Sequence, residues 1–346
     1  MTRSQNISAS GTPLDVVLFH FGGPTTEAEV EPFLFRLFMD PFILRAPLGP
    51  LRRWLAGRIS RKRWREANEQ YKQIGYSPIN RLTQHQANAL QAKLREINPD
   101  TVVRVVNRYT APFAAEVVPQ IRWDKARVVG LTLYPHLSHS TVVSSLRDFD
   151  LSVLEQRGNF PIMTRVYSWW SNPAYLDHTW RLLQPALQEA RAKHSRVTVL
   201  FSAHGLPRKY VNRGDPYVCD ILAHAGELER RGRAWIAHET SPGAATDVTW
   251  HVTFQSRVGP VEWMRPYTEQ SIVELGKARG GAVLLVPISF VSDHIETLFE
   301  MDQTYRLLAL ASGFSHYGRA IPSNESSEFT DCLVQILRSH GVIDAL

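Results

Sequence analysis

The feature that constrains this fold most is a repeated alternation of short apolar segments with amphipathic ones. The apolar segments are rich in Val, Leu and Ile, which is typical of strands buried on both faces of a parallel sheet. They lie at 15–21, 101–107, 127–134, 161–167, 197–203, 249–255 and 282–290. Between them, the stretches 84–96 and 173–192 have the spacing of amphipathic helices. This alternation predicts an α/β protein with parallel sheets flanked by helices.

The length of the chain indicates two domains. It has 346 residues, and single domains usually contain roughly 100–200. The boundary signals are faint, and the crossing is expected near 141–160. We expect an N-terminal domain over 12–145 and a C-terminal domain over 146–324. A helix within 325–346 is expected to pack back on the first domain.

Charge and cysteine content bound the partners and the compartment. The formal net charge of +6 suits an anionic partner. Cys219 and Cys332 are the only cysteines, too few for a disulfide framework, a four-cysteine cluster or a four-cysteine zinc site. The first fifteen residues lack the apolar core of a secretory leader, and no stretch approaches the ~18 apolar residues of a membrane helix. We therefore expect a cytoplasmic protein.

The segment 42–65 is strongly basic. No acid lies between Asp40 and Glu66, and apolar side chains are interleaved with the basic ones. A basic helix with an apolar side is typical of a membrane-surface element or the mouth of a ligand site. The alternative is a solvated helix that packs its apolar face on the core.

Nucleotide binding is disfavoured. Gly22-Gly23-Pro24 follows the first predicted strand, and Pro24 removes an amide donor that a phosphate-binding loop needs. No other strand is followed by a glycine-rich phosphate motif.

Side chains capable of chemistry gather where the predicted strands end, which is where ligands bind in open α/β sheets. They are His20, Phe21, Arg108, Tyr109, Tyr134, His136, Ser138, His139, Ser140, His204, Gln255, Ser256, Arg257, Asp293, His294 and Glu296. Such a set would suit a metal ion, an acidic organic ligand, or both.

Two segments carry the strongest chemical signal, and each also has a structural interpretation. His204, leaving a buried strand, is a candidate metal ligand or general base, or else a residue that caps a helix or satisfies a buried carbonyl. Glu296 follows Asp293 as in a capping box. Glu296 and Glu300, four residues apart on one helix, are also suited to coordinate a cation and relay protons.

Weaker signals surround these two. The segment 134–141 suits a carboxylate or metal site, or an ordinary Ser/Thr-rich turn. Residues 255–260 read as a turn or as an anion clamp by Arg257. Trp263 is either a core residue or a flat surface for a flat ligand.

Taken in order, the motifs resemble the ferrochelatase family along nearly the whole chain. Members of this family insert ferrous iron into a porphyrin. The segments that carry the resemblance are 17–24, 33–41, 71–79, 108–109, 133–135 with 144–146, 202–207 with 214–217, 255–260 and 292–298.

The resemblance implies two Rossmann-like domains around a porphyrin cleft, with no nucleotide and no nucleic-acid partner. It implies that His204 and Glu296 form the central pair at the metal-insertion site. It places the segment 42–65 at a lip that contacts the membrane, so we expect peripheral association at its inner face. Substrate-binding positions implied in the same way are Phe21, Arg108, Tyr109, Tyr134, Ser138, Trp263, His294 and Glu300.

The chain departs from the family's pattern at four positions. His20 stands where Asn is usual, Tyr76 where Gly is common, His139 where Cys or Thr occurs, and Thr304 where many relatives are acidic. The C-terminus lacks the cysteines that hold an iron–sulfur cluster in some relatives. We therefore expect no cluster and no permanently bound cofactor, with Fe2+ as a substrate.

The expected reaction is insertion of Fe2+ into protoporphyrin IX to form protohaem, with release of two protons. His204 is expected to accept pyrrole protons, while Glu296, with His294 and Glu300 behind it, holds the cation or carries protons away. Arg108 or Arg257 is a candidate partner for a propionate. Alternatives are coproporphyrin III as substrate, another tetrapyrrole chelatase, and a non-catalytic porphyrin-binding protein.

Overall fold

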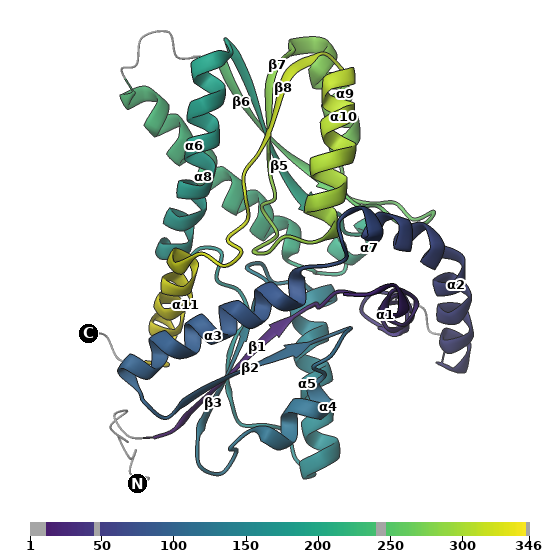
Figure 1. Cartoon of the computed structure of the whole chain (residues 1–346), viewed down its shortest axis with the longest axis vertical. Coiled ribbons are helices and arrows are strands. Elements are labelled where there is room, and N and C mark those ends of the chain that lie inside the picture. The colour runs from purple at the N-terminus through teal and green to yellow at the C-terminus, as the bar shows by residue number, and fades with distance from the viewer. Residues whose placement is uncertain (1–11, 45–48, 240–246, 344–346) are drawn as a thin grey trace.

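The protein is described from a computed structural model over residues 12–44, 49–239 and 247–343. It contains two four-stranded sheets in which all neighbouring strands are parallel. The first sheet has the order β2-β1-β3-β4 and the second the order β6-β5-β7-β8. The two halves thus share one strand order, and the expected α/β architecture with parallel sheets is confirmed (Figure 1).

The first sheet contains β1 (Leu14–His20), β2 (Thr101–Asn107), β3 (Arg127–Thr132) and β4 (Thr164–Val166). Its two faces are covered by different helix pairs. One pair is α3 (Ile79–Ile97) and α11 (Ser327–Ser339), and the other is α4 (Ala114–Val117) and α5 (Ser144–Arg157). Because both faces are buried, β1 has no exposed residue.

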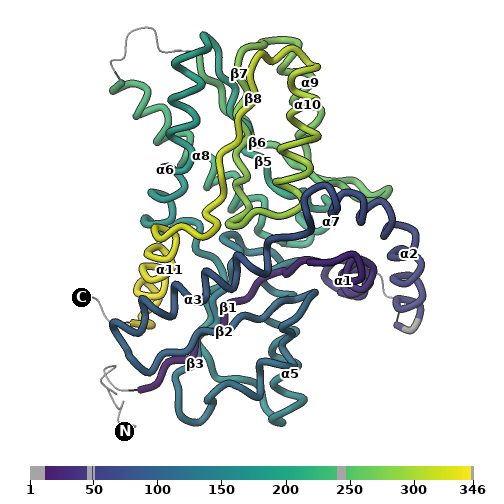
Figure 2. Tube along the Cα trace, viewed as in Figure 1, coloured from purple at the N-terminus to yellow at the C-terminus, as the bar shows by residue number. Residues whose placement is uncertain are grey.

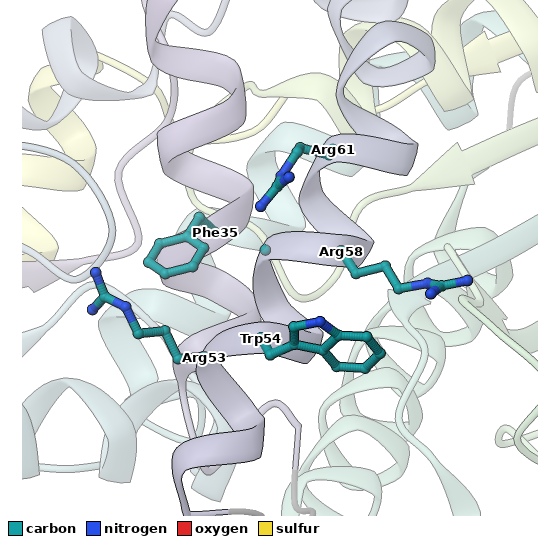
Figure 3. Close-up of a pocket in the computed structure, with 6 residues that line it drawn as sticks. Phe35, Arg53, Trp54, Arg58 and Arg61 are labelled. Carbon is teal, nitrogen blue, oxygen red and sulfur yellow. The ribbon is translucent and has the colours of Figure 1, made fainter.

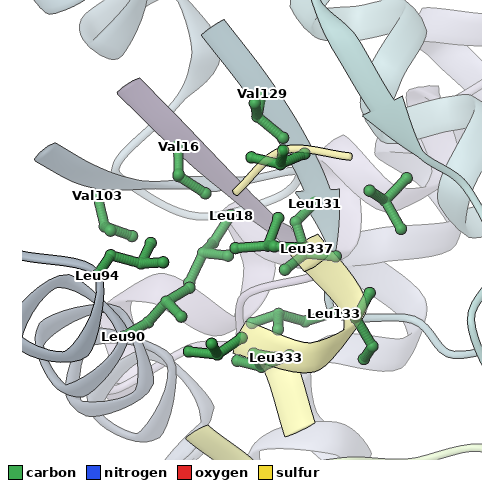
Figure 4. Packing of buried hydrophobic residues seen from close by; sticks show 14 of the residues in the cluster. Val16, Leu18, Leu90, Leu94, Val103, Val129, Leu131, Leu133, Leu333 and Leu337 are labelled. Carbon is green, nitrogen blue, oxygen red and sulfur yellow. The ribbon is translucent and has the colours of Figure 1, made fainter. Parts of the chain in front are cut away.

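The C-terminal helix α11 packs on the first sheet. Figure 2 shows it beside α3, far away along the chain. Leu333 and Leu337 of α11 pack with Leu90 and Leu94 of α3 over Leu18 of β1 (Figure 4).

The second sheet contains β5 (Arg196–His204), β6 (Asp247–Gln255), β7 (Gly281–Val286) and β8 (Phe314–Arg319). Helices α6 (Pro173–Lys193) and α8 (Tyr217–His238) cover one face. The other face is covered by α9 (Thr268–Arg279), the π-helix η3 (Glu296–Tyr305) and α10 (Arg306–Ala311).

Two further helices, α1 (Glu27–Met39) and α2 (Gly49–Gln73), project beside the first sheet (Figure 1). They pack on each other through a cluster that includes Phe33, Ala56 and Tyr71. Short elements complete the described fold: η1 (Val118–Gln120), the π-helix η2 (His139–Val143) and α7 (Arg208–Val211). Among the described residues, no helix has both the length and the apolar character needed to cross a bilayer.

The structure differs from the sequence-based expectation at three places. β8 was not predicted, because Phe314–Arg319 is a mostly polar strand at the sheet edge rather than an apolar run. β7 ends at Val286, since Pro287 cannot donate a ladder hydrogen bond. β4 pairs with β3, so the first sheet extends to Val166, beyond the boundary expected at 145/146.

Parts of several expectations lie outside the described residues. These are residues 1–11, on which the absence of a leader was judged, residues 45–48 of the basic segment, and residues 344–346 of the predicted C-terminal helix.

Candidate functional site

The structure brings His204 and Glu296 together. His204 is the last residue of β5, and Glu296 is the first residue of η3, which follows β7. These two strands are neighbours in the second sheet, so their carboxyl ends open at the same edge. His204 Nδ1 lies 4.0 Å from Glu296 Oε1. The His204 side chain is 42% exposed and that of Glu296 23%, so both remain accessible to a ligand.

Local backbone contacts fix His204 in place. Its amide donates to Ser289 Oγ, and its carbonyl accepts from the Tyr217 hydroxyl. The next residue, Gly205, donates its amide to Gln255 O, and a Cβ on Gly205 would lie 2.8 Å from that oxygen. Only glycine therefore fits there. Packing around the ring lowers the pKa of His204, with Glu296 opposing the shift and His294 adding to it.

Glu296 does not act as the capping residue that the sequence allowed. Asp293 instead accepts from the hydroxyl of Thr297, one residue further along than a capping box would use, and also from Arg319. The carboxylate of Glu296 points to two imidazoles, because its Oε2 lies 3.4 Å from His294 Nε2. π-Helices are rare and are frequent at functional sites, and sequence periodicity does not reveal them.

His294 links the pair to the first sheet. Its ring packs edge-on against Phe290, with centroids 4.3 Å apart, and its Nδ1 is buried without a hydrogen-bond partner among the described residues. Burial, and then the proximity of His294, lowers the pKa of His20 to about 3. The hydroxyl of Thr83 donates to Ile79 O and therefore accepts from His20 Nδ1. His20 is thus a neutral imidazole whose Nε2 keeps its lone pair.

Glu300 lies behind Glu296 on the same π-helix. Its Oε2 accepts from Ser256 Oγ at 2.6 Å, from Gln255 Nε2 at 3.2 Å and from the Tyr305 hydroxyl at 3.4 Å. Burial, and then the charge of Glu296, raises the pKa of Glu300 to about 7, although these hydrogen bonds oppose the shift. This carboxyl therefore gains or loses a proton near neutral pH.

Arg108 and Tyr109 belong to a network on the first domain that is already satisfied. Asp40 is fully buried and accepts from Arg108, from the Tyr109 hydroxyl, from Ser144 and from the amide of Phe42. Arg108 also pairs with Asp148 at 3.2 Å. Tyr109 has no exposed surface. A direct porphyrin contact by Arg108 or Tyr109 stays a prediction, and these bonds give both a supporting role.

The remaining predicted positions divide into two groups. Ser138 is buried and donates to Asp215, so it holds the loop before η2. Phe21, Tyr134 and Trp263 are partly exposed. The Trp263 ring packs against Gly205, next to His204. Arg257 pairs with Glu269 at 3.0 Å and lies over the Tyr267 ring.

Sequence reasoning missed three residues that support the pair. Ser289 and Tyr217 hold the His204 backbone, and Tyr305 contacts Glu300. Tyr217 lies inside a recognised motif, but nothing in a single sequence shows that it points at this edge. Gln255 was expected at this edge from its place at a strand end, but its contact with Glu300 was not. Within the described residues, no cluster of three or more His, Cys, Asp or Glu is arranged as a ready metal site.

The architecture is that of the chelatases. The chain matches a multi-domain protein from Deinococcus radiodurans that is structurally similar to chelatases, with a TM-score of 0.51 at 13% identity over 95% of this chain and 55% of that one. It also matches SirB from Bacillus subtilis, solved with Fe3+, with a TM-score of 0.50 at 12% identity over 96% and 99% of the two chains. At such low identity these likenesses concern the fold alone.

Sequence comparison then gives the family. The ferrochelatase family model matches residues 14–341. The ferrochelatase of Gloeothece citriformis is 38% identical over 327 residues, which is 93% of this chain and 81% of that protein. The chain belongs to the ferrochelatase family, whose members insert ferrous iron into a porphyrin.

Proposed function

We propose that this enzyme inserts Fe2+ into protoporphyrin IX, forms protohaem and releases two protons, with His204 and Glu296 at the reacting centre. The observation that carries the proposal is the approach of His204 Nδ1 to within 4.0 Å of Glu296 Oε1 at one edge of the second sheet. A base and a carboxylate so placed can act on one macrocycle bound between the two domains.

His204 is the base that accepts pyrrole protons. Its lowered pKa keeps the imidazole neutral at pH 7, so a lone pair is available for a proton. Metallation replaces two N–H protons by one dication, so each turnover must dispose of both protons. A wall that bends the macrocycle would turn its nitrogens toward the imidazole, which uses binding energy from the rest of the ligand.

Glu296 delivers the cation or carries protons away, with His294 and Glu300 behind it. His294 Nε2 lies 3.4 Å from Glu296 Oε2, and Glu300 titrates near pH 7. A proton that leaves the macrocycle can therefore pass to Glu300, whose pKa is close to a neutral solvent pH. Four residues beyond Glu300 along η3, where the spacing of Glu296 and Glu300 would place a third acid, stands Thr304, and the intervening Asp302 pairs with Arg319. In this chain the acidic line consequently ends at Glu300.

Protoporphyrin IX is favoured over coproporphyrin III by the state of the two arginines predicted to bind a propionate. Coproporphyrin carries four carboxylates and protoporphyrin two. Both predicted clamps already have carboxylate partners, Arg108 with Asp40 and Asp148, and Arg257 with Glu269. Protoporphyrin, with two carboxylates, needs fewer new ion pairs from this edge of the sheet than coproporphyrin, with four.

The test is anaerobic turnover with Fe2+ and each porphyrin side by side, followed by porphyrin absorbance. We expect a higher kcat/KM for protoporphyrin IX. A higher value for coproporphyrin III would overturn the substrate assignment but leave the chelatase activity. Binding of porphyrin without turnover of either substrate would instead identify a non-catalytic porphyrin-binding protein.

We also propose a cytoplasmic location with peripheral contact of the segment 42–65 at the inner membrane face. Leu51 and Trp54 of α2 are 53% and 59% exposed among basic side chains, as in helices that lie at lipid surfaces. Flotation of the purified protein with vesicles, compared with Trp54→Gln, tests this contact. Equal flotation of both proteins would refute it.

A further inference from the structure

Figure 3 shows a hollow between α1 and α2. Neither His204 nor Glu296 lines it. It is a surface hollow, open to solvent, of about 670 Å3, within the range of roughly 300–1,000 Å3 typical of small-molecule sites. Two helices form its walls, so one ligand could contact both. The residues that line it are Phe35, Arg53, Trp54, Gly57, Arg58 and Arg61.

Three of the side chains that line the hollow are arginines, and none of the described carboxylates pairs with them. Within the described part of the chain, Arg53, Arg58 and Arg61 have no carboxylate at ion-pair distance, and no acid occurs between residues 41 and 65. Arg108 and Arg257 differ from these three arginines, because Arg108 pairs with Asp40 and Arg257 pairs with Glu269. Like charges gathered on one surface favour binding of an anion.

Aromatic rings give the hollow a second kind of surface. Arg53 lies over the Phe35 ring at 5.8 Å from its centroid, and Arg58 lies over the Trp54 ring at 5.6 Å. Figure 3 shows Arg61 between these two pairs. A guanidinium stacked on a ring keeps its N–H edge available for a carboxylate, while the ring and stem offer apolar contact.

We infer that this hollow is a second, external site for a carboxylate-bearing tetrapyrrole. Three guanidinium groups can pair with two propionates, and two aromatic rings can contact a flat macrocycle. Gly57 lies at the floor of the hollow, with Arg61 and Phe35 on either side of it. The inference rests on the proposed porphyrin chemistry of the cleft, and it assigns the hollow to substrate loading or product release.

The position of α2 supports this assignment. Ala56, on the same helix as the hollow, belongs to the cluster that contains Tyr71 and, packed against it, Ile295, which precedes Glu296. A tetrapyrrole on α2 is therefore held by the same helix that packs beside the insertion site. Loss of the external site should raise KM for porphyrin and leave kcat unchanged.

The experiment is a binding titration with deuteroporphyrin, a metal-free dicarboxylate porphyrin, using equilibrium dialysis to count bound molecules. The variant combines Arg53→Gln, Arg58→Gln and Arg61→Gln. A control with the same charge change combines Arg81→Gln, Arg230→Gln and Arg233→Gln, which are surface arginines paired with Glu325, Glu227 and Glu229. Inorganic phosphate and phosphatidylglycerol vesicles serve as competitors.

We expect wild type and control to bind a second porphyrin per chain beyond the first, and the hollow variant to weaken that second event by about tenfold or more. Turnover at saturating porphyrin should stay within about twofold of wild type. A single porphyrin per chain in wild type, or an unchanged second event in the variant, overturns the inference. So does a variant that loses only vesicle binding, which would make the hollow a lipid site. Absence of iron insertion by wild type would refute the proposed function separately, because the binding count needs no turnover.

Discussion

Two groups of ionisable side chains at the strand ends, one on each domain, differ in how far their hydrogen bonds are satisfied. On the first domain, Asp40 accepts from four donors, and Arg108 has two carboxylate partners. On the second domain, His204 and Glu296 are 4.0 Å apart, beyond hydrogen-bond distance, and stay partly exposed. The first group neutralises its charges internally and supports the wall. The second leaves bonding capacity for a ligand, which is what proton and metal transfer require.

The largest effect expected from this contrast is on activity. His204→Ala should lower iron insertion by about 10²- to 10⁴-fold, since a positioned base contributes an amount of this order. Stability should change little, because the side chain is 42% exposed. Turnover and thermal melting measure the two effects. The control is His238→Ala, an exposed residue at the end of α8. A variant with near-normal insertion would remove His204 from the reaction.

The opposite pattern is expected for the first domain. Asp40→Asn replaces a fully buried acceptor by a group that also donates, and it leaves Arg108 and Tyr109 short of a partner. We expect a loss of about 3–5 kcal/mol in the free energy of unfolding, as for a broken buried ion pair. Denaturant unfolding measures it, with Asp124→Asn at an exposed ion pair as control. Retained stability together with lost insertion would place Asp40 in the chemistry and erase the contrast.

The sequence predicts where the residues of these two groups lie better than it predicts which of them are neutralised by other side chains. The buried strands and their order along the chain followed from apolar runs, and the ends of those strands located His204, Glu296 and Arg108. That Arg108 is neutralised by Asp40 and Asp148 depends on residues 68 and 40 positions away along the chain, which periodicity does not pair. The π-helix of Glu296 was also hidden, because its hydrogen bonds shift by one residue without a change in composition.

A smaller, pH-dependent effect distinguishes a carboxyl of the second domain. The pKa of Glu300 is about 7 in the folded protein, above the ordinary value of 4.5. A raised pKa means that the folded state binds the proton of Glu300 more tightly than the unfolded state does. The free energy of unfolding therefore falls as the pH rises from about 4.5 through 7. Glu300→Gln should therefore raise the free energy of unfolding at pH 8 by about 1–3 kcal/mol, with little change at pH 4.5.

The same variant should also change the pH profile of insertion. If Glu300 receives protons from the site, the limb of the profile near pH 7 should disappear in Glu300→Gln. Glu274→Gln, an exposed position on α9, is the matched control. A stability gain that is the same at pH 4.5 and pH 8 would show that Glu300 does not titrate as the burial of its carboxyl implies.

The smallest effect concerns His20. This first-domain imidazole is the one whose pKa is lowered by His294, which lies beside Glu296. Its pKa of about 3 lies below the ordinary 6.5, so the folded state holds it neutral. The stability that it contributes is present above pH 6.5 and is lost as pH falls toward 3. His20→Asn should cost about 1 kcal/mol at pH 7.5, where the bond to Thr83 is lost, and this cost should shrink or reverse at pH 5. Melting at both pH values, with exposed His85→Asn as control, measures the difference. If insertion falls as well, His20 acts with His294, and the division between a supporting wall and a reacting wall would have to be redrawn through the first domain.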